Sequence, residues 1–387
     1  MKLILFSAGF RVFFPLGAIG AVLLLPYWVM LITGYSDYLP SYFSPMAWHQ
    51  HEMVFGVFAP IIIGFLFTAV PNWTGKPSPT GLPLALLGLL WIMGRIAIFN
   101  ADLLPNFVPL ILDVSLLPLA IMGIAPAIFQ TGNKRNYFLP IMLMVFACFN
   151  LFSHLSALEI VNLDENNFFV ASLLFIVMLM NVIGGRIAPS FLKNKYPTVE
   201  QKNFKLILPI SIVSIILIII CTVSDAPEYI TGIFSFIVSI CLLIRLWGWK
   251  GWIAISDPLQ IILHIGILWI AVGFLLLAYA SFFDDTYVVL SYHAFSIGAA
   301  GSLTLGVMSR AMIGHSGRPM NNEVILTTIF CLINLSAISR IVAPVILTDH
   351  YTIMLFVSGI CWVLAYALFL IRFIPLVLQP RMDVNLS

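Results

Sequence analysis

Histidines inside apolar stretches are the side chains of this sequence best suited to chemistry. His49, His51 and Glu52 stand within four consecutive positions, and His154 and His293 occur in two other apolar stretches. Imidazole is the commonest metal ligand in proteins, and neutral imidazoles in an apolar environment suit haem iron or copper. On a helix of 3.6 residues per turn, His49 and His51 point about 200° apart. They cannot both bind one iron, so the second of them binds copper, pairs with Glu52 or is merely solvated.

The composition identifies the elements that must position these histidines as membrane-spanning helices. The chain has 387 residues, of which 61% are apolar and only 9% are charged, whereas soluble domains carry roughly 25% charged residues. The five cysteines lie inside apolar runs without CxxC spacing, which favours small buried side chains over disulfides or a zinc site. No Walker or dinucleotide-binding fingerprint is present. We therefore expect no coupling to ATP or NAD within the chain and no nucleic-acid partner.

Twelve apolar stretches are long enough to cross a bilayer, since a spanning helix needs about 20 mostly apolar residues. The expected spans are 12–34, 48–71, 81–100, 107–129, 137–160, 168–189, 205–223, 228–247, 258–282, 288–313, 323–347 and 352–377. Connections between them are short, except for the stretch 190–203. The sequence thus predicts an all-α polytopic membrane protein, with residues 1–387 forming a single transmembrane domain.

The distribution of charge predicts the orientation of these spans. With a cytoplasmic N-terminus, the loops on the inner side hold every lysine and arginine from Lys2 onward except Arg95 and Arg340. The opposite loops, beginning with the one that contains Asp37, carry acidic residues and no Lys or Arg. Because basic residues mark cytoplasmic loops, both termini are expected in the cytoplasm.

This orientation brings several polar side chains to one depth. His51 and His293 lie at the outer ends of the second and tenth spans, and His154 lies in the outer half of the fifth. Arg95 and Arg340 lie at a similar depth in the third and eleventh spans. At a rise of about 1.5 Å per residue, these levels differ by only a few ångströms. A single histidine usually just hydrogen-bonds to a backbone carbonyl or water; three helices contributing at one level make a cofactor site a serious alternative.

A set of short motifs resembles the NnrS family of bacterial membrane proteins over essentially the whole chain. The matching pieces are Gly9–Phe14, Trp48–Gly56, Gly64–Leu66, Ala69–Gly75, Gly94–Ala97, Gly184–Pro189, His264–Gly266 and His293–Pro319. Val12 stands where the family would have Pro, and Ser316 where it has Thr. The resemblance implies a haem- and copper-containing protein linked to nitric oxide metabolism and to resistance against nitrosative stress. It also implies a location in a bacterial inner (cytoplasmic) membrane.

A fainter similarity connects the second and tenth spans with the catalytic subunit of haem–copper oxidases. By that resemblance, His51 and His293 would be the two axial ligands of a low-spin haem. The ligand of the oxidase's reactive haem would fall at Ser291, which is not a histidine, and the sixth and seventh spans contain no His for the oxidase's copper. The resemblance therefore implies a bis-His haem b without an oxidase-type binuclear centre.

Together these observations predict a haem-binding membrane redox protein. His51 and His293 would hold haem b, Arg95 or Arg340 would pair with its propionates, and His49 or His154 are candidate copper ligands. Electron transfer is the expected reaction class, with quinol as a candidate donor, nitric oxide as a candidate ligand and membrane lipids as neighbours. The alternatives are a twelve-helix secondary transporter without haem and a membrane assembly protein that holds neither metal nor solute.

Three polar features have no assigned role at this stage. Glu52 and His264 are ionisable side chains within apolar stretches. The segment Arg310–Pro319 joins two arginines and His315 in a Gly-containing turn at the inner end of the tenth span. That segment either holds an anionic headgroup or a quinone, or it is simply a cytoplasmic anchor that ends the helix.

Overall fold

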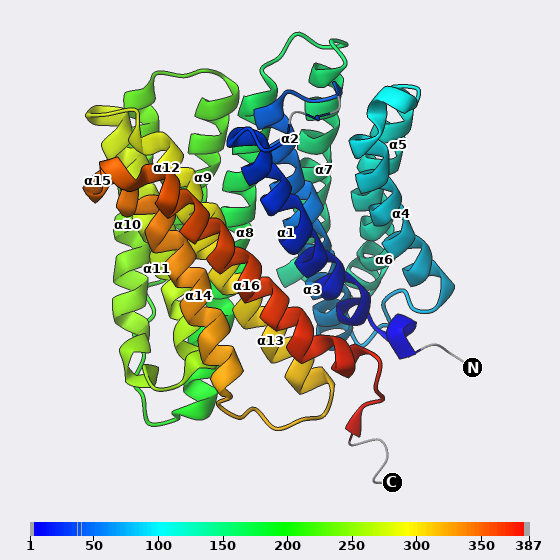
Figure 1. Ribbon diagram of the computed structural model, residues 1–387. Helices are drawn as coiled ribbons and strands as arrows, with labels where there is room; N and C mark the ends of the chain where they lie inside the picture. The colour runs from blue at the N-terminus through cyan, green and yellow to red at the C-terminus, as the bar shows by residue number, and fades with distance from the viewer. Residues whose placement is uncertain (1–3, 37, 40, 383–387) are drawn as a thin grey trace. The chain divides into compact units, whose positions relative to one another are not determined.

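The structure is a computed structural model that describes residues 4–36, 38–39 and 41–382. Every regular element in this part of the chain is helical (Figure 1). Lys2 and Asp37 lie outside the described residues. The chain divides into two compact units: the first comprises Met1–Ser172, Ala311–Pro319 and Phe369–Ser387, and the second comprises Leu173–Arg310 and Met320–Leu368.

The first unit is built from the helices of the N-terminal part of the chain. They are α1 (Gly9–Ile32), α2 (Pro45–His51), η2 (Glu52–Phe58), α3 (Ala59–Thr74), α4 (Leu82–Phe99), α5 (Phe107–Val114), α6 (Leu116–Gln130), α7 (Phe138–Ala157) and the start of α8 (Glu165–Lys195). Helix α1 packs against α3 and η2, and α5 packs against α4 and α7. Near the other end of the chain, Arg11 of α1 donates hydrogen bonds to the carbonyls of Val377 and Gln379, both at 2.8 Å. The Val377 carbonyl lies in the last turn of a helix and the Gln379 carbonyl just after it, where a cation is favourable.

The second unit contains the remaining α-helices and the second π-helix. They are the rest of α8, α9 (Ile207–Val223), α10 (Glu228–Trp249), α11 (Pro258–Phe282), α12 (Tyr287–His293), η6 (Ala294–Gly301), α13 (Ser302–His315), α14 (Val324–Ile341), α15 (Ala343–Ile346) and α16 (Tyr351–Val377). The C-terminal turns of α13 and α16 belong to the first unit. Helix α10 packs against both α9 and α11.

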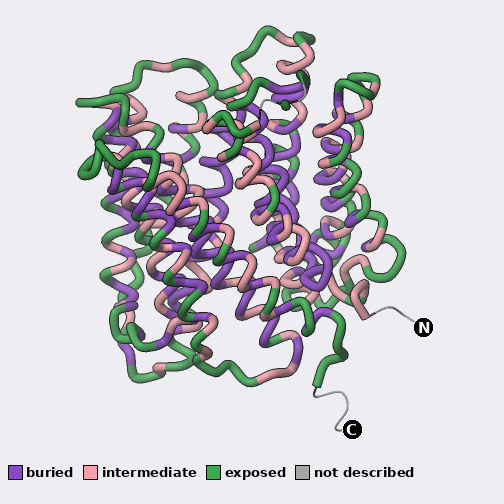
Figure 2. The backbone as a smooth tube through the Cα atoms, in the orientation of Figure 1, coloured by how far each residue is buried: buried purple, intermediate pink, exposed green. Residues whose placement is uncertain are grey.

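The helices have the length and the surface of membrane spans. Eleven helices in the described part of the chain are long and apolar enough to cross a bilayer, and α9 is a shorter apolar helix of 17 residues. Figure 2 shows buried and exposed stretches alternating along individual helices, and large apolar side chains such as Leu23, Met122 and Ile371 are more than 60% exposed. Such apolar surface is stable against lipid and costly in water. The chain is thus a multi-pass membrane protein.

Each of the twelve predicted stretches is helical, although 107–129 is divided into α5 and α6 and 323–347 into α14 and α15. Because α9 is shorter than the eleven membrane-length helices, the count of twelve spans stays a prediction, as do the cytoplasmic termini. The other differences concern where helices end. The second span does not end at Pro71 but runs to Thr74, because Gly75 (φ +69°) adopts the left-handed conformation that closes a helix. The connection predicted for 190–203 is helical as far as Lys195. Helix α8 continues through Pro189, whose carbonyl accepts a hydrogen bond from the Gln201 side chain at 2.9 Å.

Two of the spans contain a π-helical segment. These are η2, which starts directly after His51, and η6, which starts directly after His293; the described residues contain no other. A π-helix widens the turn and occurs mostly at functional sites. Both histidines that the sequence predicted as haem ligands thus stand at a break from regular α-helical geometry.

Candidate metal centre

His51 is fully buried within the first unit, and oxygen atoms surround both of its ring nitrogens. Nδ1 lies 3.1 Å from Glu52 Oε1, while Nε2 lies 3.1 Å from Asp113 Oδ2 and 3.2 Å from Asn150 Oδ1. The Phe43 ring stacks against the imidazole with the two centroids 4.9 Å apart. A neutral imidazole has only one N–H. A proton or a metal ion is therefore needed at the second nitrogen to satisfy these oxygens.

His154 of α7 contacts the same carboxylate oxygen. It is fully buried, and its Nε2 lies 3.1 Å from Asp113 Oδ2. Its Nδ1 lies 2.7 Å from the hydroxyl of Tyr42, which belongs to the loop before α2. Burial raises the pKa of Tyr42, so the phenol keeps its proton. That hydroxyl donates to Nδ1 when Nε2 holds a proton, and it accepts from Nδ1–H when Nε2 binds a metal ion.

Two carboxylates and one guanidinium complete the group. Arg95 of α4 donates from Nη1 to Glu52 Oε1 at 2.7 Å, and its Nη2 contacts Asp113 Oδ1. Asn150 donates from Nδ2 to Asp113 Oδ2 at 2.7 Å. Glu52 Oε2 is buried without a hydrogen-bond partner. With both histidines neutral, the group carries one net negative charge in an apolar environment, which favours uptake of a proton or a cation.

The local helix geometry explains how these side chains meet. In η2, a Cβ on Gly56 would lie 2.8 Å from Glu52 Oε2 and 3.1 Å from Arg95 Nη1, so only glycine leaves room for this pair. The Gly56 carbonyl accepts a hydrogen bond from Trp91 Nε1 of α4 at 3.1 Å. Asp113 approaches from α5 and packs against Gly94 of α4, where a Cβ would lie 3.4 Å from its nearest atoms, an ordinary van der Waals distance.

The arrangement has the dimensions of a metal site. One ligand atom each from His51, Asp113 and His154 lies within 4.8 Å of the other two. Both Nε2 atoms are 3.1 Å from Oδ2, close to the spacing between neighbouring ligands at about 2.0–2.2 Å from an ion. Two imidazoles and a carboxylate suit copper, zinc or iron and leave a coordination position open.

The contacts of His51 fit an ion more readily than a haem. Its Nε2 faces Asp113 and Asn150, and the Phe43 ring covers one side of the imidazole. A porphyrin bound at Nε2 would require that carboxylate and amide to move away. The axial role of His51 stays a prediction, but these neighbours favour a bare metal ion at this nitrogen.

The remaining predicted site residues lie elsewhere. His49 stacks on Trp28 with the centroids 4.4 Å apart and is not part of the metal group. His293 belongs to the second unit, where its Nδ1 lies 2.7 Å from the Val289 carbonyl. Because that carbonyl accepts the Nδ1 proton, Nε2 is the unprotonated nitrogen, as an axial ligand requires. Arg340, also in the second unit, lies over the Tyr351 ring. Pairing of these residues with a haem stays a prediction.

Sequence reasoning missed the carboxylate at the middle of this group. From the sequence, Asp113, Tyr42 and Asn150 were assigned no role. One available signal was general: an ionisable side chain within a membrane span is functional by default. Arg95 was selected as a propionate partner, and the structure pairs it with Glu52 and Asp113.

Comparison with protein families gives one match that covers nearly the whole chain. The family described as "NnrS protein" matches residues 4–381. Comparison with curated protein sequences gives no match.

Proposed function

The chain belongs to the NnrS family, and on that premise we propose that it is a copper-binding redox protein of the bacterial cytoplasmic membrane. The convergence of His51, Asp113 and His154 in a buried group carries this proposal. The family resemblance supplies the setting, which is nitric oxide metabolism or resistance to nitrosative stress. Electron transfer, with quinol as the donor, is the reaction class.

Copper is the ion that this group accommodates best. Imidazole and carboxylate ligands bind Cu²⁺ more tightly than other divalent first-row ions. With Arg95 paired to two carboxylates, the surroundings carry one net negative charge, which offsets part of the charge of a bound Cu²⁺ ion. A bound copper ion supplies a one-electron redox couple and an open position for a small ligand such as nitric oxide.

The protein's own contribution is to hold the ligand atoms in place. Glu52 accepts the Nδ1 proton of His51, which directs Nε2 of that ring toward the ion. The Tyr42 hydroxyl likewise accepts the Nδ1 proton of His154 and leaves its Nε2 free to bind an ion. Asn150 holds Asp113 by its amide, and the surrounding aromatic rings exclude water from the group. These contacts would reduce the movement of the ligand side chains when a bound copper ion changes its oxidation state.

Copper content of purified variants tests the site. We expect about one copper ion per wild-type chain and loss of that copper in His154→Ala, because removing a ligand leaves only two. Tyr42→Phe should weaken copper binding by about 10–100-fold, as is usual when the partner of a ligating imidazole is removed. Elemental analysis and titration with a competing chelator measure both effects.

His49→Ala is the matched control for this experiment. It removes an imidazole only two positions from His51, yet His49 stacks on Trp28 outside the group, so copper content should remain at the wild-type level. Equal copper loss in His49→Ala and His154→Ala would contradict the proposed ligand set.

The response to nitric oxide tests the functional setting. We expect the electron paramagnetic resonance signal of the copper protein to change when nitric oxide is added, since three protein ligands leave a position open. Asp113→Asn, which keeps the shape but not the charge of the side chain, should abolish that response. An unchanged spectrum in the copper-loaded wild type would argue against nitric oxide as a ligand.

A second candidate retains a haem b between His51 and His293. The start of a π-helix after each of these residues favours it. Copper and haem iron would compete for the same nitrogen of His51, so the two assignments predict different losses in the same variants.

A further inference from the structure

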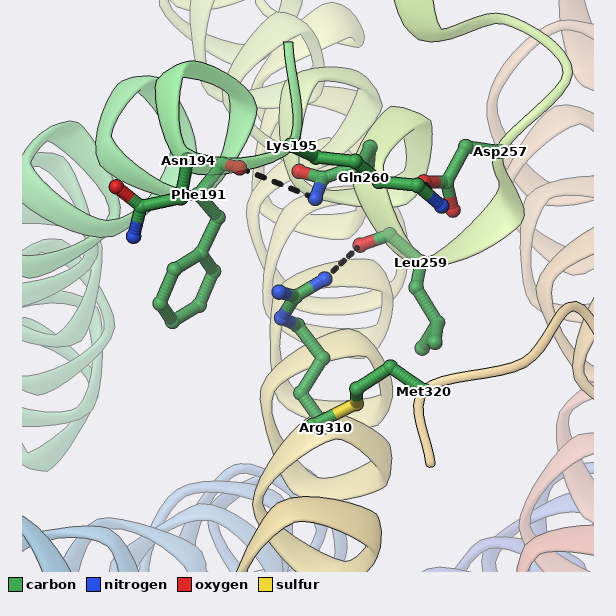
Figure 3. A pocket seen from close by; sticks show the side chains of 8 residues that line it. All are labelled: Phe191, Asn194, Lys195, Asp257, Leu259, Gln260, Arg310 and Met320. Atoms are coloured by element: carbon green, nitrogen blue, oxygen red, sulfur yellow. Dashed lines mark hydrogen bonds and ion pairs between the residues drawn. The ribbon is translucent and has the colours of Figure 1, made fainter. Parts of the chain in front are cut away.

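A cavity of about 260 Å³ lies in the second unit, where the C-terminal end of α8 meets the start of α11 and helix α13 (Figure 3). Its walls combine charged and apolar side chains, among them Lys195, Asp257 and Arg310. A water molecule occupies about 30 Å³ in the liquid. The cavity therefore has room for a molecule several times larger than water.

The cationic wall of the cavity is Arg310. Its guanidinium lies over the Phe191 ring at 4.1 Å from the centroid, and Nη1 donates to the Leu259 carbonyl at 3.5 Å. Its Nε is buried without a hydrogen-bond partner. Stacking holds the guanidinium flat and leaves an N–H edge for an acceptor.

Asp257 and Gln260 line another part of the cavity, and each has one hydrogen-bond acceptor atom without a partner. Asp257 is 2% exposed; its Oδ2 binds Lys195 Nζ at 2.5 Å, but its Oδ1 has no partner. Gln260 is 1% exposed; its amide nitrogen donates to the Phe191 carbonyl at 3.3 Å, but its Oε1 has no partner. Buried acceptors are almost always satisfied in folded proteins. A ligand for this cavity must therefore bring hydrogen-bond donors.

The charges of the cavity decide what else the ligand needs. Lys195 and Arg310 carry two positive charges and Asp257 one negative charge, which leaves one net positive charge to be neutralised. We propose that the cavity binds an anionic phosphodiester that carries hydroxyl groups. The phosphate accepts from Arg310, and the hydroxyls donate to Asp257 and Gln260. The glycerol headgroup of an anionic phospholipid has this chemistry, and so has a free glycerophosphodiester; basic pockets near the cytoplasmic ends of spans are typical sites for such headgroups.

Native mass spectrometry of the full-length protein tests the proposal with three probes at equal concentration: dioctanoyl phosphatidylglycerol, dioctanoyl phosphatidylcholine and chain-free glycerophosphoglycerol. We expect phosphatidylglycerol to bind at least about tenfold more tightly than phosphatidylcholine, which has the phosphate but no hydroxyl and no net charge. Binding of the chain-free probe as tightly as the lipid identifies a soluble source, and binding of the lipid alone identifies the membrane.

Substitution of Arg310 provides a second test of the proposal. Arg310→Gln should abolish the preference for phosphatidylglycerol. Arg372→Gln is the matched control, because Arg372 also lies over an aromatic ring, that of Phe373, but lies outside the cavity. Equal binding of the two lipids to the wild type, or equal loss of the preference in both variants, overturns the proposal. If Arg310→Gln fails to fold, the comparison of phosphatidylglycerol and phosphatidylcholine binding to the wild type still tests the proposal.

Discussion

Arg95→Met lowers the free energy of unfolding of the metal-free protein by about 3–5 kcal/mol, which is the usual cost of removing one partner from a buried ion pair. Arg95, Glu52 and Asp113 are 11%, 2% and 4% exposed at their side chains. Without the guanidinium, two carboxylates face each other in an environment that cannot solvate them. Methionine keeps most of the volume, so the loss reports charge and hydrogen bonds more than packing.

Unfolding in mixed SDS–detergent micelles measures this effect. Arg340→Met is the matched control: Arg340 has a similar predicted depth in the membrane and lies over the Tyr351 ring, so its loss should cost far less. Adding Glu52→Gln to Arg95→Met should restore part of the stability, about 1–3 kcal/mol, because the pair is directly coupled. A cost for Arg95→Met no larger than that for Arg340→Met would refute this electrostatic account.

His51→Ala and His293→Ala should differ in whether the purified protein retains copper. With copper between His51, Asp113 and His154, His51→Ala removes a ligand, so we expect its copper content to fall close to zero while His293→Ala keeps its copper. Any haem b, measured as the pyridine haemochrome, should survive in His51→Ala. Elemental analysis and the haemochrome assay on the same samples measure both groups together.

The alternative pairing of His51 with His293 predicts that both variants lose haem and keep copper. A bis-His haem loses its iron coordination in both variants, so both would lose the haemochrome signal while copper stayed unchanged. That outcome would place His51 with the haem and leave the metal group without its first ligand. A haemochrome signal at the wild-type level in both variants would remove the haem assignment altogether.

How far the site could be predicted depends on the distance along the chain between its members. His51 and Glu52 are adjacent, and their membership of one apolar span is visible in the sequence. Asp113 and His154 come from α5 and α7, so their approach to His51 depends on how those helices are rotated. A helix that is apolar on nearly every side has no polar face from which that rotation can be read.

The sequence by itself determined the membrane character and the order of the helices, because the length and composition of an apolar run are local properties. Only the tertiary structure decided that Asp113 joins His51 to His154, and that Arg95 faces two carboxylates. The π-helix after His51 adds to this, since it shifts the angular positions of the residues that follow relative to a regular helix. Which polar side chains meet is therefore a consequence of helix packing, which acts between segments distant in the chain.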